Sequence, residues 1–188
     1  MTSARRLVRG VTAAIALGLA GFGTAFAAPL EGDRSVWLSA PDGERARIAS
    51  VHFVRLESGS SRFDLHLDGP GFGDFFLAMR PVRCLTGPRE QLCHFPYGKR
   101  NVVSLSDLSA LEYQLLFMHK KASTVSLDPR DGMYWILHVE GDRLVGELQD
   151  ADLDPIVAPQ GDADHPLTKE YLQPADESSH WLPRLTIE

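Results

Sequence analysis

Short segments with the pattern of β-strands, separated by turns, constrain the fold of this chain more than any other feature of its sequence. Residues 62–68 alternate strictly between apolar and polar side chains, which is typical of a half-buried antiparallel strand. Residues 48–56 are rich in β-branched and aromatic side chains, and the Ser-Gly-Ser loop at 58–60 follows them. The two segments are therefore predicted to pair as a hairpin.

A second hairpin is predicted further along the chain. Residues 133–139 and 143–148 are two strand-like runs, and the Glu-Gly-Asp sequence at 140–142 lies between them. A glycine in so short a connection is a strong hairpin signal. This is the clearest pair of strands that the sequence predicts.

Cys84 and Cys93 are the only cysteines, and Gly87-Pro88 between them indicates a turn. In an oxidising compartment a mutual disulfide is the expected state of such a pair. Residues 75–84 are expected to form one strand, which 91–95 would join across the bridge. Redox catalysis would favour a C-x-x-C spacing, and a zinc site would need further clustered ligands. A structural disulfide is therefore predicted.

Residues 107–120 are predicted to form one amphipathic helix, because Leu108, Leu111, Leu115 and Met118 would lie on one stripe. The chain shows no alternation of strands and helices, which excludes a doubly wound α/β fold. We expect a mainly β (α+β) fold: a curved antiparallel sheet or partly open β-barrel of about six strands, with this helix packed on it.

The N-terminus has the pattern of an export signal. Arg5, Arg6 and Arg9 precede an apolar run at 11–20, and an A-x-A cleavage pattern ends at Ala27. Residues 1–27 are therefore predicted to be a cleaved signal peptide, and 28–188 a single β-rich domain. A retained membrane anchor is the alternative. The twin-arginine route is a second possibility, but the flanking residues favour general secretion. We expect a periplasmic or extracellular protein with no integral membrane segment after cleavage.

Charge is distributed unevenly along the predicted mature chain. Cleavage after Ala27 removes three positive charges from a net charge of −6, which leaves 161 residues with a net charge of −9. This balance disfavours nucleic acid as a partner. Residues 150–188 carry nine acids against two basic residues, whereas residues 80–100 carry five basic residues against one acid. Residues 150–177, acidic and interrupted by prolines, are interpreted as a long surface excursion.

The basic stretch around the disulfide mixes arginines with aromatic residues, a composition typical of interface hot spots. It is equally compatible with a solvated hairpin, with docking of the acidic C-terminal segment, or with an external anionic partner. The candidate binding patch comprises Arg80, Arg83, Arg89, Phe95, Tyr97, Lys99 and Arg100.

No catalytic residue, cofactor or metal site is predicted. The chain contains no G-x-S-x-G, S-x-x-K, H-E-x-x-H or C-x-x-C motif. Asp150, Asp152 and Asp154 resemble the start of a calcium loop, but Pro155 replaces the required glycine. A solvated acidic loop is therefore the preferred interpretation. A looser cation site is the alternative, adding Asp162, Asp164 and His165.

The sequence favours an exported, non-enzymatic binding or interaction module for a protein or small-molecule partner. This hypothesis predicts an apolar cavity between sheet and helix, or an uncovered arginine patch. The alternative is a hydrolase with a His/Asp or metal site, which would require an acid and at least two of three histidines to converge. Those histidines are His52, His66 and His138. A structural role in the cell envelope is the third hypothesis.

Overall fold

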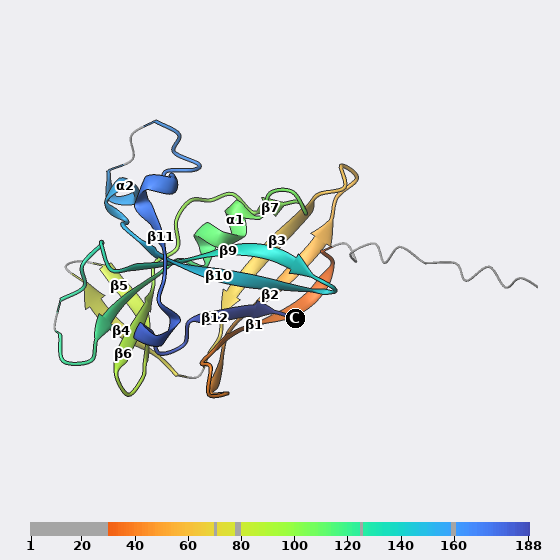
Figure 1. The fold of residues 1–188 in the computed structure, drawn as a ribbon. Coiled ribbons are helices and arrows are strands. Elements are labelled where there is room, and N and C mark those ends of the chain that lie inside the picture. Colours follow the sequence, from red (N-terminus) through yellow and green to blue (C-terminus); the bar gives the residue numbers. More distant parts are fainter. Residues whose placement is uncertain (1–29, 70, 78–79, 125, 159–160) are drawn as a thin grey trace, which may run out of the picture.

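An antiparallel sheet of 12 strands is the framework of the described part of the protein. The computed structural model describes residues 30–69, 71–77, 80–124, 126–158 and 161–188. The strands follow the order β4-β5-β6-β8-β9-β10-β12-β1-β2-β3-β7, and β11 pairs with β10 outside this path. Figure 1 shows the sheet strongly bent, with β4, β5 and β6 at one end and β1, β2 and β3 at the other. The sheet is open, since β4 and β7 each pair with one strand among the described residues.

The bounds of the strands are β1 Gly32–Ser39, β2 Arg45–Arg55, β3 Ser61–Leu67, β4 Phe72–Leu77, β5 Arg80–Thr86, β6 Glu90–His94, β7 Val102–Val103, β8 Phe117–Lys121, β9 Gly132–Glu140, β10 Arg143–Ala151, β11 Leu172–Pro174 and β12 Arg184–Ile187. The helical segments are α1 Ser109–Gln114, α2 Asp154–Val157, and the 3₁₀ turns η1 Lys169–Tyr171 and η2 Glu177–Ser179. The expected β-rich, antiparallel architecture is confirmed, but the expectation of about six strands is wrong. Strands as short as β7 and β11 do not contain enough residues to show an alternating pattern.

Both predicted hairpins are present. β2 and β3 pair antiparallel from Ala49 opposite Leu67 to Arg55 opposite Ser61. β9 and β10 pair along their whole lengths. Gly141 lies in the turn of the second hairpin with a φ of 65°, a conformation that glycine adopts without strain.

The predicted helix at 107–120 is largely wrong. Only α1 is helical, and Phe117–Lys121 forms strand β8 between β6 and β9. The apolar residues of this region fit a helical stripe. Residues 117–121 instead pair with β6, and residues 117 and 118 also pair with β9. These strand partners override the helical pattern of the sequence. α1 contacts β9 and β7 and is a minor part of the fold.

The strand predicted over 75–84 is in fact two strands. β4 and β5 form an antiparallel pair from Phe72 opposite Leu85 to Leu77 opposite Arg80. The chain therefore reverses between Leu77 and Arg80, where residues 78–79 lie outside the described ranges. β6 returns beside β5, as predicted.

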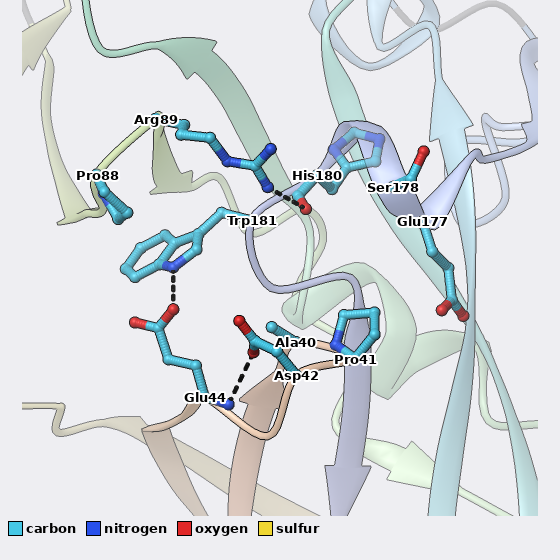
Figure 2. Close-up of a pocket in the computed structure, with 10 residues that line it drawn as sticks. All are labelled: Ala40, Pro41, Asp42, Glu44, Pro88, Arg89, Glu177, Ser178, His180 and Trp181. Carbon is cyan, nitrogen blue, oxygen red and sulfur yellow. Dashed lines mark hydrogen bonds between the residues drawn. The ribbon is translucent and has the colours of Figure 1, made fainter.

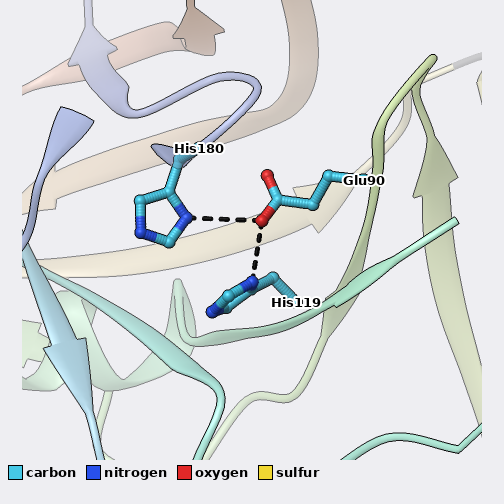
Figure 3. A group of neighbouring side chains, drawn as sticks. All are labelled: Glu90, His119 and His180. Atoms are coloured by element: carbon cyan, nitrogen blue, oxygen red, sulfur yellow. Dashed lines mark ion pairs between the residues drawn. The ribbon is translucent and has the colours of Figure 1, made fainter. Parts of the chain in front are cut away.

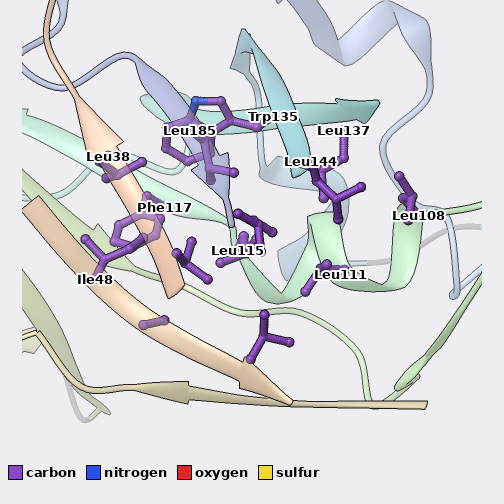
Figure 4. Packing of buried hydrophobic residues seen from close by; sticks show 14 of the residues in the cluster. Leu38, Ile48, Leu108, Leu111, Leu115, Phe117, Trp135, Leu137, Leu144 and Leu185 are labelled. Atoms are coloured by element: carbon purple, nitrogen blue, oxygen red, sulfur yellow. The ribbon is translucent and has the colours of Figure 1, made fainter. Parts of the chain in front are cut away.

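Buried side chains fill the interior between the two ends of the bent sheet and α1. Figure 4 shows Leu111 of α1 and Leu115, which follows α1, in one buried cluster with Phe117 and Trp135 of the sheet. The indole N–H of Trp135 donates a hydrogen bond to the Pro183 carbonyl at 2.7 Å, so this buried polar group is satisfied. Buried side chains of this cluster thus occupy the space between the sheet and α1, where the binding-module hypothesis expected an apolar cavity.

The C-terminus packs back onto the sheet. β12 lies between β10 and β1, and Ile187 is opposite both Leu144 and Val36. Trp181 and Leu182 are buried. The acidic stretch at 150–177 is partly regular, since it includes the end of β10, α2, η1 and β11.

The predicted signal peptide at residues 1–27, and the anchor that is its alternative, lie outside the described residues. Within the described ranges, no helix is long and apolar enough to cross a membrane.

Candidate functional site

The predicted disulfide joins the β5–β6 hairpin. Cys84 and Cys93 lie directly opposite each other, with their Cα atoms 4.0 Å apart, and both residues are buried. A buried disulfide is compatible with an exported protein. The bridge holds the hairpin whose turn contains Pro88 and Arg89 and whose second strand begins at Glu90.

The arginines of the candidate binding patch have separate surroundings. Arg83 donates to the Leu67 carbonyl at 3.0 Å, and Arg89 donates to the His180 carbonyl at 3.5 Å. Arg100 pairs with Asp107 at 3.4 Å. The Arg80 side chain lies outside the described part of the chain. The function of these residues as one binding surface stays a prediction.

The remaining patch residues lie along the chain that follows β6. Lys99 is exposed, whereas Phe95 and Tyr97 are half-buried and pack against the second core cluster. The Tyr97 hydroxyl donates to the Ala163 carbonyl at 2.8 Å. Acidic residues of 150–188 form no ion pair with the described basic side chains of 80–100. Arg89 and Tyr97 instead contact backbone carbonyls of the C-terminal segment.

Three side chains converge beneath the turn of this hairpin: Glu90 of β6, His119 of β8 and His180 after η2. Figure 3 shows the two imidazoles directed at one carboxylate oxygen. His119 Nδ1 lies 2.7 Å and His180 Nδ1 3.4 Å from Glu90 Oε1. Among the described residues this is the one group of three or more His, Cys, Asp or Glu side chains with potential ligand atoms within 4.8 Å of one another.

The fold explains how the three residues meet. In the β6–β8 pair, Glu90 is opposite Lys121 and Leu92 is opposite His119. Glu90 and His119 are therefore diagonal neighbours on one face of the sheet. The backbone N–H of Trp181 donates to Glu90 Oε2 at 2.8 Å, which fixes the C-terminal segment over the hairpin and places His180 above the other two side chains.

The carboxylate of Glu90 is held in its charged form. Burial alone would raise its pKa, but the close contacts of the carboxylate with the His119 and His180 imidazoles, together with the hydrogen bond from the Trp181 N–H, outweigh burial and lower the pKa to about 2. Burial would likewise lower the pKa of His180, but Glu90 and Asp150 outweigh it and raise that pKa. The Glu90 carboxylate is therefore negatively charged, and its Oε1 atom faces the two imidazoles.

The two nitrogens of His180 differ in their surroundings. Nε2 hydrogen-bonds Asp150 Oδ1 at 2.9 Å. Nδ1 has no hydrogen-bond partner of good geometry, although the His180 side chain is only 2% exposed. Buried polar nitrogens are rarely left without a partner, so this atom requires an explanation.

A cleft of about 330 Å³ lies beside this cluster, and His180 also lines it. Figure 2 shows its three walls: the β1–β2 turn, the hairpin turn at Pro88 and Arg89, and the segment that contains η2 and Trp181. Its lining comprises Ala40, Pro41, Asp42, Glu44, Pro88, Arg89, Glu177, Ser178, His180 and Trp181. The Trp181 indole N–H donates to Glu44 Oε2 at 2.8 Å, which joins two of the walls.

A second constellation resembles a serine–histidine–acid arrangement. Ser109 Oγ lies 3.2 Å from His165 Nε2, and His165 Nδ1 lies 2.9 Å from Asp162 Oδ2. The Ser109 hydroxyl donates to Asp107 Oδ1 at 2.6 Å, while Arg100 Nη1 lies 2.9 Å from the same His165 nitrogen. The serine proton is thus directed away from the histidine, so this arrangement lacks the nucleophile–base hydrogen bond of a catalytic triad.

The other histidines considered for catalysis do not share a site. His52, His66 and His138 are exposed. His52 pairs with Asp33 at 2.6 Å, and His138 lies 4.0 Å from Glu140. These contacts do not form the concave site that the hydrolase hypothesis requires.

The acidic trio does not form a calcium loop. Asp150 is directed at His180, while Asp152 Oδ1 accepts the backbone N–H of Asp154 at 2.9 Å. Asp162 holds His165. The looser cation site is therefore not assembled from these residues.

Glu90, His119 and His180 are not among the site residues that the sequence predicts. The three residues lie in three separate segments, and no short motif joins them. The one signal in the sequence that could indicate this site is Glu90, the only acid of residues 80–100. Comparisons with protein-family models, with curated proteins and with solved structures found no match to this chain.

Proposed function

We propose that this protein is an exported, non-enzymatic binding module that holds a positively charged peptide in the cleft beside the disulfide hairpin. The observation that carries the proposal is the charge of the lining. The lining contains three carboxylates, those of Asp42, Glu44 and Glu177, against the Arg89 guanidinium and the His180 imidazole, and Glu177 is also paired with Arg184. A concave surface with this excess of negative charge favours cationic ligands.

The hydrogen bonds within the cleft leave part of each carboxylate for a ligand. Asp42 Oδ1 accepts the backbone N–H of Glu44, and Glu44 Oε2 accepts the Trp181 indole N–H. Glu177 Oε2 accepts from Arg184 Nε at 3.0 Å. In each case the bond engages one oxygen, so the other can receive a donor from a ligand.

Apolar and polar walls together favour a peptide over a simple amine. Pro41, Pro88 and Ala40 supply apolar surface, while the Arg89 guanidinium offers hydrogen-bond donors for carbonyl groups. An exported location, which the N-terminal pattern predicts and the disulfide is compatible with, would expose the cleft to extracellular or periplasmic peptides.

The test titrates the ¹⁵N-labelled protein with N-acetyl-Lys-Pro-Arg-amide and follows the indole N–H signal of Trp181 by NMR. Because this N–H is bonded inside the cleft, a bound peptide should shift its signal saturably. Replacing Asp42→Asn and Glu177→Gln together should weaken binding about tenfold, since exposed ion pairs contribute up to about 1 kcal/mol each.

The matched control is the double variant Glu57→Gln and Asp74→Asn, which removes the same charge at exposed positions outside the cleft. It should bind the peptide as the wild type does. The acidic peptide N-acetyl-Glu-Pro-Glu-amide should cause no saturable shift. Equal shifts from both peptides, or no saturable shift at millimolar concentration, would contradict the proposal.

A further inference from the structure

The cluster beneath the hairpin has the features of a metal site. Two imidazole nitrogens and one carboxylate oxygen lie within 4.8 Å of one another. Imidazole and carboxylate together suit zinc and related first-row ions, whereas Mg²⁺ and Ca²⁺ prefer ligands that are all oxygen. Two histidines with one glutamate form a known set of protein ligands for zinc.

One distance between the potential ligand atoms matches that around a tetrahedral ion, and a second is shorter. Bonds of about 2.0–2.1 Å place neighbouring ligand atoms roughly 3.3 Å apart. His180 Nδ1 lies 3.4 Å from Glu90 Oε1. His119 Nδ1, at 2.7 Å from the same oxygen, would need to move outward by about 0.6 Å. The His119 side chain is 23% exposed, which leaves it room for this change.

The surroundings already orient the three groups for an ion. Asp150 engages His180 Nε2, so the lone pair of Nδ1 can be directed at the cluster. Such a carboxylate–histidine contact is the usual outer-sphere support of a metal-binding imidazole. The Trp181 N–H engages Glu90 Oε2 and leaves Oε1 facing the two histidines.

An ion at this position would also explain the buried nitrogen of His180. Its Nδ1 has no hydrogen-bond partner of good geometry, although the side chain is almost completely buried. A coordinate bond would satisfy it.

We propose that Glu90 Oε1, His119 Nδ1 and His180 Nδ1 bind one zinc ion, with Asp150 orienting His180. Three protein ligands leave one tetrahedral position for water or another small ligand. The ion would also join the C-terminal segment to strands β6 and β8, and so stabilise the folded protein. The proposal does not depend on the occupant of the cleft.

Isothermal titration calorimetry of the purified protein with ZnCl₂ tests the proposal. The wild type should bind one ion per chain, and MgCl₂ should give no binding heat. His119→Gln should lower the zinc affinity at least 100-fold, and Asp150→Asn about 10-fold or more. His52→Gln is the matched control, because it removes a histidine that also pairs with a carboxylate but is exposed. It should leave the affinity unchanged.

Thermal unfolding provides the second readout. Zinc should raise the melting temperature of the wild type and of His52→Gln, but not that of His119→Gln. If His119→Gln fails to fold, the lower zinc affinity expected of Asp150→Asn still tests the site. Absence of zinc binding, or equal affinities of the wild type and His119→Gln, would overturn the proposal. An unchanged affinity of Asp150→Asn would overturn the orienting role of Asp150.

Discussion

Glu112 of α1 is a buried carboxyl whose replacement tests how α1 is joined to the sheet. Its Oε1 accepts the backbone N–H of Leu137 at 2.8 Å, and its Oε2 accepts the Tyr134 hydroxyl. Both donors belong to β9, so one side chain connects the helix to the sheet. Burial raises the pKa of Glu112, and the two hydrogen bonds oppose this effect only in part.

Glu112→Leu leaves the Leu137 N–H and the Tyr134 O–H buried without an acceptor. Each such donor costs about 1–3 kcal/mol, so the variant should lose roughly 2–6 kcal/mol of stability. Glu112→Gln can still accept from the Leu137 N–H, and its amide can donate to the Tyr134 oxygen, so it leaves only the Tyr134 proton without an acceptor and should lose less. Urea denaturation at neutral pH measures both free energies of unfolding.

The same pair of proteins gives a prediction for pH dependence. A carboxyl whose pKa is higher in the folded than in the unfolded state binds more protons when folded. Its contribution to stability is complete below the unfolded pKa and is lost as the pH rises through the folded pKa. Glu112→Gln lacks this group. The stability of the wild type relative to Glu112→Gln should therefore fall as the pH increases above the usual glutamate range.

Two outcomes would refute this reasoning. One is equal stability of the Leu and Gln variants, which would mean that the buried donors find other acceptors. The other is a difference between wild type and Glu112→Gln that stays constant from pH 4 to pH 8, since no proton would then be linked to folding.

Two further predictions concern the hairpin and the segment that covers it. A Cβ at Gly87 would overlap the ring of Trp181, so Gly87→Ala should lower the free energy of unfolding by about 1–3 kcal/mol. Gly73→Ala is the control, because a Cβ at Gly73 meets no atom within 4 Å. Equal melting temperatures of the two variants would contradict this packing. Reduction of Cys84–Cys93 should lower stability by about 2.5–3 kcal/mol by chain entropy, or the melting temperature by about 5–12 °C. Calorimetry after verified reduction checks this, and an unchanged melting temperature would show that the bridge does not stabilise the fold.

The parts of the fold that local patterns determine were predictable. The β2–β3 and β9–β10 hairpins combine strand-like sequences with glycine-containing turns, so neighbouring residues contain most of the required information. The disulfide followed from the cysteine count and the turn between the two residues.

The region after Ser106 shows where local patterns fail. Leu108, Leu111 and Leu115 fit a helical stripe, but the chain leaves the helix after Gln114 because β6 and β9 provide hydrogen-bond partners for residues 117–121. Such partners lie far away in sequence, so the apolar spacing cannot report them. The error also placed His119 on a helix, which concealed its position next to Glu90.

The candidate metal site was not predictable for the same reason. Glu90, His119 and His180 meet only because β8 pairs with β6 and because the Trp181 N–H binds Glu90. Each residue alone is typical of a surface or hydrogen-bonded side chain. Their shared chemistry depends on tertiary structure, which a single sequence without a spacing motif does not reveal.

X-ray diffraction at the zinc absorption edge, from crystals of the protein grown with zinc, tests the central claim most directly. The account predicts one anomalous peak per chain, bonded to Glu90 Oε1, His119 Nδ1 and His180 Nδ1 at about 2.0–2.2 Å. It also predicts that Asp150 stays hydrogen-bonded to His180 Nε2. Absence of a peak among these three side chains, with zinc bound elsewhere or not at all, would contradict the account.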